Sequence, residues 1–328
     1  MDKIDVSKIL RVRTEAGQIF RTLIDVLKEV ITSTDFTFLS NEDNGEYPTK
    51  KEKDESSSDS DEEDEEEKEE KDEKKTEPKK VKGGIKIMAV DEKKQTMIYI
   101  KLDSSNFSDF YVKHKSLTVG LDIKELYKFM KSIDKNSIMT ISMNKDERQK
   151  IEFSLYNPQK SSTKYYRQKL METNDDNRKS FRDLDFECSV FMETQEFKKI
   201  CTEMSQFAEH IEIVCTEKEI VFKCLGDNSD VIYKYKIAEN SNVKILWNDK
   251  KNNVVQSIYN LKNLVTFGRC VNLCDDIILY LKNSYPLFIQ YSVGNLGKML
   301  VGFMTADLND IKHNHNLNKE IQKLDTKK

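Results

Sequence analysis

The chain of 328 residues is long enough for two ordinary domains with a sizeable core. Its formal charge of −4 is unevenly distributed, because residues 41–82 hold 19 acidic and 10 basic residues and the rest of the chain carries +5. None of the six cysteines has CxxC spacing, which favours buried thiols in a reducing compartment. No apolar run approaches the ~18 residues of a membrane span, and the N-terminus is charged, so we expect neither secretion nor membrane insertion.

Four amphipathic segments are predicted to be helices. In each, apolar residues recur three and four positions apart while basic residues share the other face. The segments are residues 17–31, 121–133, 194–204 and 259–269. Successive helices start about 62 to 72 residues apart once the acidic segment is set aside, which predicts a repeat of one helix and several strands.

Between and after these helices, alternation of apolar and polar residues predicts antiparallel strands. Asp35–Leu39 and Ile85–Val90 read as a hairpin with the acidic segment inserted at its tip, where insertions are tolerated. The segment itself is too charged to fold alone. The other predicted strands are 96–102, 116–119, 138–143, 151–156, 188–192, 211–215, 220–225, 231–237, 243–247, 277–281, 287–293 and 300–304.

The pattern divides the chain into two halves. We expect a first domain over residues 1–162, with 41–82 as a disordered acidic insert in a hairpin loop, and a second domain over 188–308. Residues 163–187 are expected to form an extended connector, because the stretch 157–183 has little periodicity. The polar residues 309–328 are expected to be a flexible tail.

Four sequence blocks carry a family resemblance. They are GIKIMAVDEKKQTMIYIKLDSSNF (Gly84–Phe107), LYKFMKSI (Leu126–Ile133), EFKKICTEMS (Glu196–Ser205) and YPLFIQYSVGNLGKM (Tyr285–Met299). In order and spacing they resemble the proliferating cell nuclear antigen family of eukaryotic and archaeal sliding clamps, over about residues 9–308 apart from the insert. The resemblance implies an α+β, two-domain DNA-clamp fold with four βαβββ-like repeats, in which helices line the inside of a ring and antiparallel sheets form the outside.

The resemblance also implies a function without catalysis. Three copies would form a homotrimer that encircles duplex DNA irrespective of sequence, acts as a polymerase processivity factor, and docks a clamp loader and other replication and repair proteins. We expect this in the nucleus, or at a cytoplasmic replication site if the chain comes from a large DNA virus. No cofactor, metal or membrane is expected, because the four histidines lack a catalytic or ligand constellation and no phosphate-binding glycine loop occurs.

Basic residues on the predicted helices are the candidates for lining the bore. Long cationic side chains facing phosphates across water give diffuse attraction that permits sliding. For any one helix, a plain solvated face is the alternative. Thr202 and Glu203 stand where the family carries a basic and an acidic residue, so the third helix is expected to contact DNA less. The candidates are Arg21, Lys28, Lys124, Lys128, Lys131, Lys198, Lys199, Lys262 and Arg269.

Two further surfaces follow from the resemblance. A groove for partner peptides would use Val90, Lys94, Leu170, Met171, Pro286 and Met304. The connector lacks the family's Leu-Gly-Ile-Pro run and the family's C-terminal Leu-Ala-Pro is also replaced, so partner specificity is expected to differ, and a core role for Met304 is the alternative. Pairing of strand edges between subunits would use Ile151, Phe153 and Leu155 of one copy with Val231, Tyr233 and Tyr235 of the next.

Other functions remain open at this point. The chain could be one subunit of a heteromeric, checkpoint-type clamp, or an acidic histone-binding scaffold that no longer encircles DNA. Ser56, Ser57, Ser58 and Ser60 precede acidic residues and suit acidophilic kinases. We hypothesise that the acidic insert competes with DNA for basic surfaces or recruits a basic partner such as histones. A tolerated, solubilising insertion is the alternative.

Overall fold

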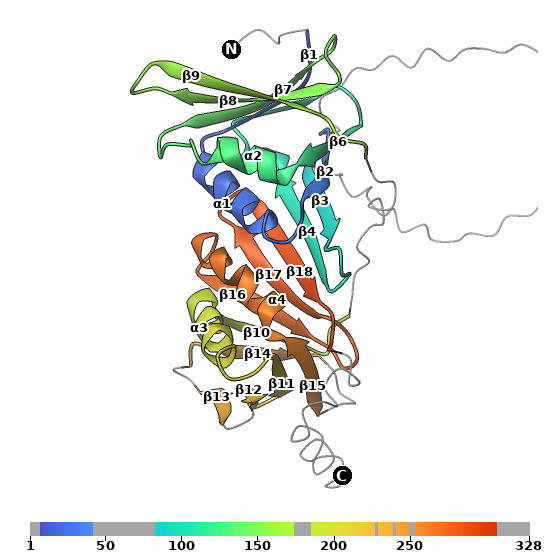
Figure 1. The fold of residues 1–328 in the computed structure, drawn as a ribbon. Coiled ribbons are helices and arrows are strands. Elements are labelled where there is room, and N and C mark those ends of the chain that lie inside the picture. Colours follow the sequence, from blue (N-terminus) through green and yellow to red (C-terminus); the bar gives the residue numbers. More distant parts are fainter. Residues whose placement is uncertain are drawn as a thin grey trace, which may run out of the picture.

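The structure, a computed structural model, describes residues 7–41, 83–173, 185–226, 229–238, 241–248 and 253–306. These form an elongated α+β subunit with the helices on one side of a long antiparallel sheet (Figure 1). The helices are α1 (Gly17–Leu27), α2 (Ile123–Met130), α3 (Thr194–Met204) and α4 (Leu261–Thr266), with 3₁₀ turns η1 (Ser104–Asn106) and η3 (Phe267–Asn272).

The described part of the chain has eighteen strands. Those of the first half are β1 (Lys8–Thr14), β2 (Ser33–Leu39), β3 (Gly84–Val90), β4 (Thr96–Asp103), β5 (Asp109–Val112), β6 (Ser116–Asp122), β7 (Ile138–Asn144), β8 (Lys150–Asn157) and β9 (Ser162–Lys169). Those of the second half are β10 (Cys188–Glu193), β11 (His210–Thr216), β12 (Glu219–Leu225), β13 (Asp230–Lys236), β14 (Lys244–Trp247), β15 (Val254–Asn260), β16 (Asp276–Leu281), β17 (Leu287–Val293) and β18 (Gly297–Phe303).

One sheet joins the two halves of the chain. Its nine strands run in the order β14-β10-β16-β17-β18-β4-β3-β2-β6, so that β18 of the second half pairs with β4 of the first. A five-stranded sheet, β5-β1-β7-β8-β9, completes the first half, and a four-stranded sheet, β13-β12-β11-β15, completes the second. The three sheets together give the α+β clamp fold that the sequence predicts.

The predicted repeat is present four times as strand, helix and three strands. The units are β1-α1-β2-β3-β4, β6-α2-β7-β8-β9, β10-α3-β11-β12-β13 and β15-α4-β16-β17-β18. In every unit the helix follows its first strand closely. The side chains of Asp122 and Asn260 accept backbone hydrogen bonds at the starts of α2 and α4, which fixes where these two helices begin.

The helices form one layer because their apolar faces pack on the sheets. Phe20, Leu23 and Ile24 of α1 are completely buried, and Phe197 and Ile200 play the same part in α3. Contacts between α1 and α2, α1 and η3, and α3 and α4 make the layer continuous across both halves. All of these helices are amphipathic or short, and none of the described ones is long and apolar enough to cross a membrane.

Several boundaries differ from the sequence prediction, among them the ends of α1 at Leu27 and of α2 at Met130 rather than at 31 and 133. Tyr259 and Asn260 belong to β15 rather than to the fourth helix, since they pair with β11, and that helix then tightens into η3. Leu121 lies in β6, which ends at Asp122, instead of starting a helix. Residues 163–169 of the expected connector lie in β9, which sequence periodicity missed because only Gln168 of this strand is buried.

The acidic insert enters and leaves the fold at one point. The predicted hairpin is confirmed, because β2 and β3 pair up to Leu39 and Gly84. Beyond them, Asn41 Oδ1 accepts hydrogen bonds from the Gly83 backbone N–H at 3.0 Å and from the Ser104 hydroxyl at 2.6 Å. The predictions for residues 42–82 themselves, including the four serines, lie outside the described residues, as do those for 309–328.

The cysteines are unpaired thiols, as the sequence predicts. All but Cys274 are buried, and Cys274 is partly exposed. Burial raises the pKa of the Cys201 thiol above its ordinary value, so this side chain stays neutral and packs as an apolar group.

The junction between the halves generates a stability prediction. A Cβ on Gly297 would lie 2.1 Å from the Lys101 carbonyl oxygen of β4, which is backbone and cannot move aside alone. Gly297→Ala should therefore lower the free energy of unfolding by about 2 kcal/mol or more, measured by urea denaturation. Gly268→Ala is the control, because its Cβ would meet only the flexible Lys198 side chain, at 3.2 Å. Equal stability of the two variants would contradict the prediction.

Candidate nucleic-acid interface and partner surfaces

All nine candidate cations lie on the helix layer or at its helix ends. Arg21 is on α1 and Lys28 follows it, Lys124 and Lys128 are on α2 and Lys131 follows. Lys198 and Lys199 are on α3, Lys262 is on α4 and Arg269 is in η3. The structure thus gathers on one side of the subunit side chains that are up to 248 positions apart in sequence.

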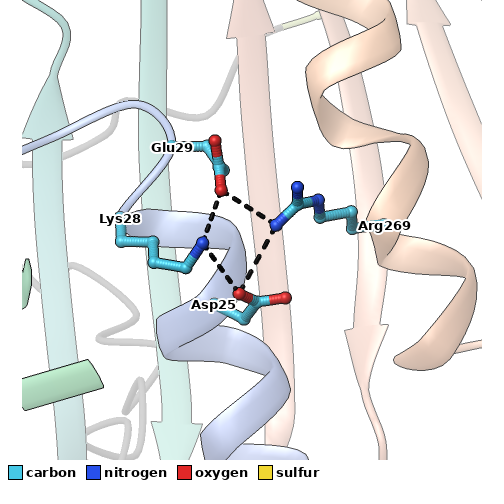
Figure 2. Close-up of polar contacts among 4 residues, drawn as sticks. All are labelled: Asp25, Lys28, Glu29 and Arg269. Carbon is cyan, nitrogen blue, oxygen red and sulfur yellow. Dashed lines mark hydrogen bonds and ion pairs between the residues drawn. The ribbon is translucent and has the colours of Figure 1, made fainter. Parts of the chain in front are cut away.

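Two of these cations are already held by carboxylates of the same chain. Lys28 Nζ lies 3.0 Å from Asp25 and 2.5 Å from Glu29, and the Arg269 guanidinium lies 3.5 Å from Asp25 and 2.8 Å from Glu29. Figure 2 shows Arg269 reaching from the second half of the chain to both carboxylates of the first. The four charges cancel, and the Lys28 side chain is only 18% exposed, so this group connects the halves rather than presenting free positive charge.

Tyr127 of α2 also contacts this group of charged side chains. Its ring lies 4.4 Å from Lys28 Nζ and 5.0 Å from Lys131 Nζ. Burial tends to raise the pKa of Asp25, but hydrogen bonds from Tyr127 and Lys28 outweigh it and lower that pKa. A hydrogen bond from Lys28 likewise lowers the pKa of Glu29. Both carboxylates therefore stay ionised, and their contribution to stability is lost only as the pH falls through these lowered values.

Of the other seven candidate cations, Lys128 forms an ion pair and six form none with a described carboxylate. Lys128 Nζ lies 2.5 Å from Glu125 one helical turn away, an exposed pair of small energetic weight. No described carboxylate lies within ion-pair distance of Arg21, Lys124, Lys131, Lys198, Lys199 or Lys262. These six are the side chains of the layer whose charge is available to an anionic partner.

Sequence reasoning missed Asp25, Glu29 and Tyr127. The spacing of Asp25 and Lys28, three residues apart on a helix, is a signal that could have indicated a pair. The approach of Arg269 could not be read from the sequence, because it depends on how the two halves join. Across the part of the chain that is described, no group of three or more His, Cys, Asp or Glu side chains could hold a metal ion.

The expected subunit edge needs a correction. β8 pairs with β7 on one side and β9 on the other, so it has no free edge, and Ile151, Phe153 and Leu155 are buried in the core of their own chain. The edge of that sheet is β9. At the other end β13 is an edge strand, as expected, with Tyr233 and Tyr235 donating hydrogen bonds to Glu203 and Glu196 of α3.

Among the described sheet edges, β9 and β13 are the two long ones left open. β5 and β14 have four residues each. Met171 bridges to β6 at Gly120, and Thr305 bridges to β15 at Tyr259, so these two edges are partly covered. Figure 1 shows β9 and β13 at opposite ends of the subunit. Long unpaired edges invite pairing with another chain.

The groove candidates fall into two groups. Val90 and Met304 are 45% and 52% exposed, and the Met304 N–H donates to the Gln95 carbonyl, beside Lys94 in the turn between β3 and β4. Pro286 precedes β17, whose Leu287 pairs with Phe303, so it lies at the same end of the nine-stranded sheet. Leu170 and Met171 instead follow β9, where Met171 bridges to β6 at Gly120, and β2 lies between β6 and the strand β3 that ends in Val90. An exposed Met304 rules out the core role considered for it.

Comparisons with known proteins agree with this architecture. Family models for the N-terminal and C-terminal domains of proliferating cell nuclear antigen match residues 77–179 and 180–306. The N-terminal match begins near the end of the acidic insert, although β1, α1 and β2 pack into the same fold.

Three relatives are similar along much of the chain. A "probable DNA polymerase sliding clamp" of Acanthamoeba polyphaga mimivirus is 28% identical over 92% of this chain, which spans 63% of that protein's length. A "probable DNA polymerase sliding clamp 1" of Paramecium bursaria Chlorella virus 1 is 28% identical over 66% of this chain and 82% of its own length. "Proliferating cell nuclear antigen 2" of Drosophila melanogaster is 27% identical over 69% and 86%. The chain belongs to the proliferating cell nuclear antigen family, as a divergent sliding clamp with an acidic insertion.

Proposed function

We propose that this protein is a ring-forming DNA sliding clamp without catalytic activity. Three copies close head to tail, and duplex DNA passes through the ring without base-specific contacts. The ring makes a DNA polymerase processive and docks a clamp loader and other replication and repair proteins. It acts where DNA is replicated, in the nucleus or at a viral replication site.

The observation that carries the proposal is the continuous helix layer with six unpaired cations. Phosphates of a duplex are contacted by such side chains without regard to sequence. Charge screening over about 8 Å at physiological salt keeps the attraction weak enough for movement along the duplex. The open edges β9 and β13 support closure, because different surfaces at opposite ends of one subunit generate a ring when the rotation closes.

Val90, Lys94, Pro286 and Met304 supply the partner groove in this proposal. Val90 and Met304 are exposed and Pro286 is half-buried at one end of the nine-stranded sheet, where an amphipathic helical peptide could bury its anchor residues. Leu170 and Met171, at the β6 edge, are separated from these four residues by β2 and would form a second part of the surface. Partners of the protein are expected to differ from those of other clamps, because the connector and the segment after β18 depart from the family pattern.

The topological link to DNA can be tested directly. The protein, once loaded, should stay on nicked circular DNA through a high-salt wash and should leave the same DNA after it is linearised, because a ring slides off free ends. Retention is measured by gel filtration of the DNA-bound fraction. Linear DNA with both ends blocked by a bound protein is the control and should retain the ring. Equal loss from circular and linear DNA would contradict encirclement.

The charge pattern of the bore predicts unequal effects of single cations. Lys124→Ala should reduce the slope of log K against log salt by up to about 0.9, because one phosphate contact is lost. Lys28→Ala should change the slope less, since Asp25 and Glu29 already compensate its charge. Binding to duplex DNA is followed by anisotropy at several salt concentrations, with Lys244→Ala on β14 as the control. If Lys28→Ala and Lys124→Ala changed the salt slope equally, this expectation would be wrong.

A further inference from the structure

Three lysines lie side by side across the strands that join the two halves of the chain. Lys86 of β3 is directly opposite Lys101 of β4, and Lys101 is directly opposite Lys298 of β18. Neighbouring strands are about 4.8 Å apart, so this lysine row is about 10 Å long. Like charges that lie directly opposite one another destabilise a sheet. Backbone pairing and buried apolar residues hold these strands together, so the lysine row needs an explanation other than stability.

The lysine row lies on the face of the sheet that is turned away from the helices. Its neighbours along the strands, Ile87, Ile100 and Met299, are completely buried in the core on the opposite face. Because successive residues of a strand point to opposite faces, the lysines point outward. They are half-buried on β3 and β4 and exposed on β18. The lysine row is therefore separate from the nine candidate cations of the bore, and duplex DNA inside the proposed ring would not contact it.

Little negative charge in the described part of the chain compensates the lysine row. Lys101 Nζ lies 3.7 Å from Asp103, in an exposed ion pair of small energetic weight. No described carboxylate lies within ion-pair distance of Lys86 or Lys298. The outer face of the sheet thus has a concentration of positive charge at the junction of the two halves, and this charge is complementary to an anionic partner.

The length and the ends of the lysine row indicate what it binds. Thr37 of β2 pairs with Lys86 and Ser292 of β17 pairs with Lys298, so a hydroxyl group continues the row at each end. Ammonium and hydroxyl groups both donate hydrogen bonds to carboxylate or phosphoryl oxygens. Acidic side chains on one face of an extended peptide are about 7 Å apart, so several of them in series match a row about 10 Å long.

The strands of the lysine row lead to the proposed partner groove. β3 runs from Gly84 through Lys86 to Val90, and β18 contains Lys298 and is followed by Met304. At about 3.3 Å per residue, Lys86 lies about 13 Å from Val90, and Lys298 lies about 20 Å from Met304. A peptide with its apolar anchors in the groove therefore reaches the lysine row with residues roughly four to six positions away from those anchors.

We infer that the lysine row binds an acidic segment of a partner protein, next to the apolar residues with which that partner occupies the groove. The inference rests on the proposed partner groove and specifies the chemistry of its partners. Such a partner has a stretch rich in Asp, Glu or phosphoserine beside its apolar anchors. A partner with basic residues at the same place is disfavoured, because like charges repel.

Binding of an acidic probe tests the lysine row. A fluorescein-labelled oligoglutamate peptide is followed by anisotropy at low ionic strength. It should bind the wild type, and it should bind a triple variant with Gln at all three positions of the row at least about tenfold more weakly. A control variant with the same change of charge should bind like the wild type; it carries Lys145→Gln, Lys218→Gln and Lys244→Gln, at exposed positions in three different parts of the chain. Thermal unfolding verifies that both variants are folded. Equal binding by the two variants would overturn the inference.

A chain without residues 42–82 separates two sources of acidic residues. If oligoglutamate binds only after this deletion, the acidic insert of the chain itself occupies the lysine row, and the inference of a partner is overturned. Absence of binding to both chains overturns it as well.

A linked probe tests whether the lysine row and the groove take the same partner. An amphipathic helical peptide with Leu and Phe anchors is compared with the same peptide extended by a linker of about five residues and a run of glutamates. The extension should tighten binding to the wild type by about tenfold or more, and it should not do so with the triple variant. Equal affinity of the wild type for the two peptides would overturn the inference.

The same experiments separate this inference from the proposed function. If neither linked nor unlinked peptide binds while oligoglutamate does, the proposed groove is wrong and the lysine row remains an anion site. The triple variant should stay on nicked circular DNA like the wild type, because the lysine row lies outside the bore. Loss of that retention in the triple variant would contradict the placement of the row.

Discussion

The arrangement of the whole subunit depends on the backbone pairing of β18 with β4. Seven residue pairs, from Gly297 with Leu102 to Phe303 with Thr96, turn two separate halves into one nine-stranded sheet. Hydrogen-bonded strands fix both the distance and the relative twist of the parts they join. The helices of each half pack on the same face of this sheet, so the pairing also aligns α1, η3 and α3 into one layer. Close approach of the two backbones explains the glycine at position 297.

The group of Asp25, Lys28, Glu29 and Arg269 crosses the same junction on the helix side (Figure 2). Here α1 and η3 approach each other, and the carboxylates of Asp25 on α1 and of Glu29 just after it bind cations from both halves. This divides the basic residues of the layer by location. Lys28 and Arg269, next to the junction, are ion-paired within the chain, whereas Arg21 and the unpaired lysines on or just after α2, α3 and α4 have no described carboxylate partner.

Sequence patterns predicted the helices well where burial is strong and periodic. The segment from Thr194 to Met204 has the predicted bounds, because Phe197, Ile200 and Met204 mark one face clearly. The prediction failed where polar residues form regular structure: β9 is stabilised by backbone pairing with β8 and has little apolar alternation. It placed the subunit edge on β8 for the same reason, since the apolar alternation of Ile151, Phe153 and Leu155 indicates a strand but not its neighbours.

Among the candidate site residues, the nine basic positions could be named from helical periodicity, and the structure brings them to one layer. Their ionic partners could not be predicted completely. Asp25 and Glu29 are close to Lys28 in sequence, but the fourth member, Arg269, comes from the other half and depends on the pairing of β18 with β4. The open edge at β9 likewise follows from sheet order, which a single sequence does not reveal.

The hydrogen bonds around Asn41 have a consequence for how this protein can evolve. They hold together the two ends of the loop between β2 and β3. The register of these strands therefore does not depend on the residues in the loop. Each doubling of such a loop adds only about 0.6 kcal/mol to the cost of closing it. Length and charge of this region can therefore change from one lineage to another by insertion or deletion of codons, with no compensating change in the sheets.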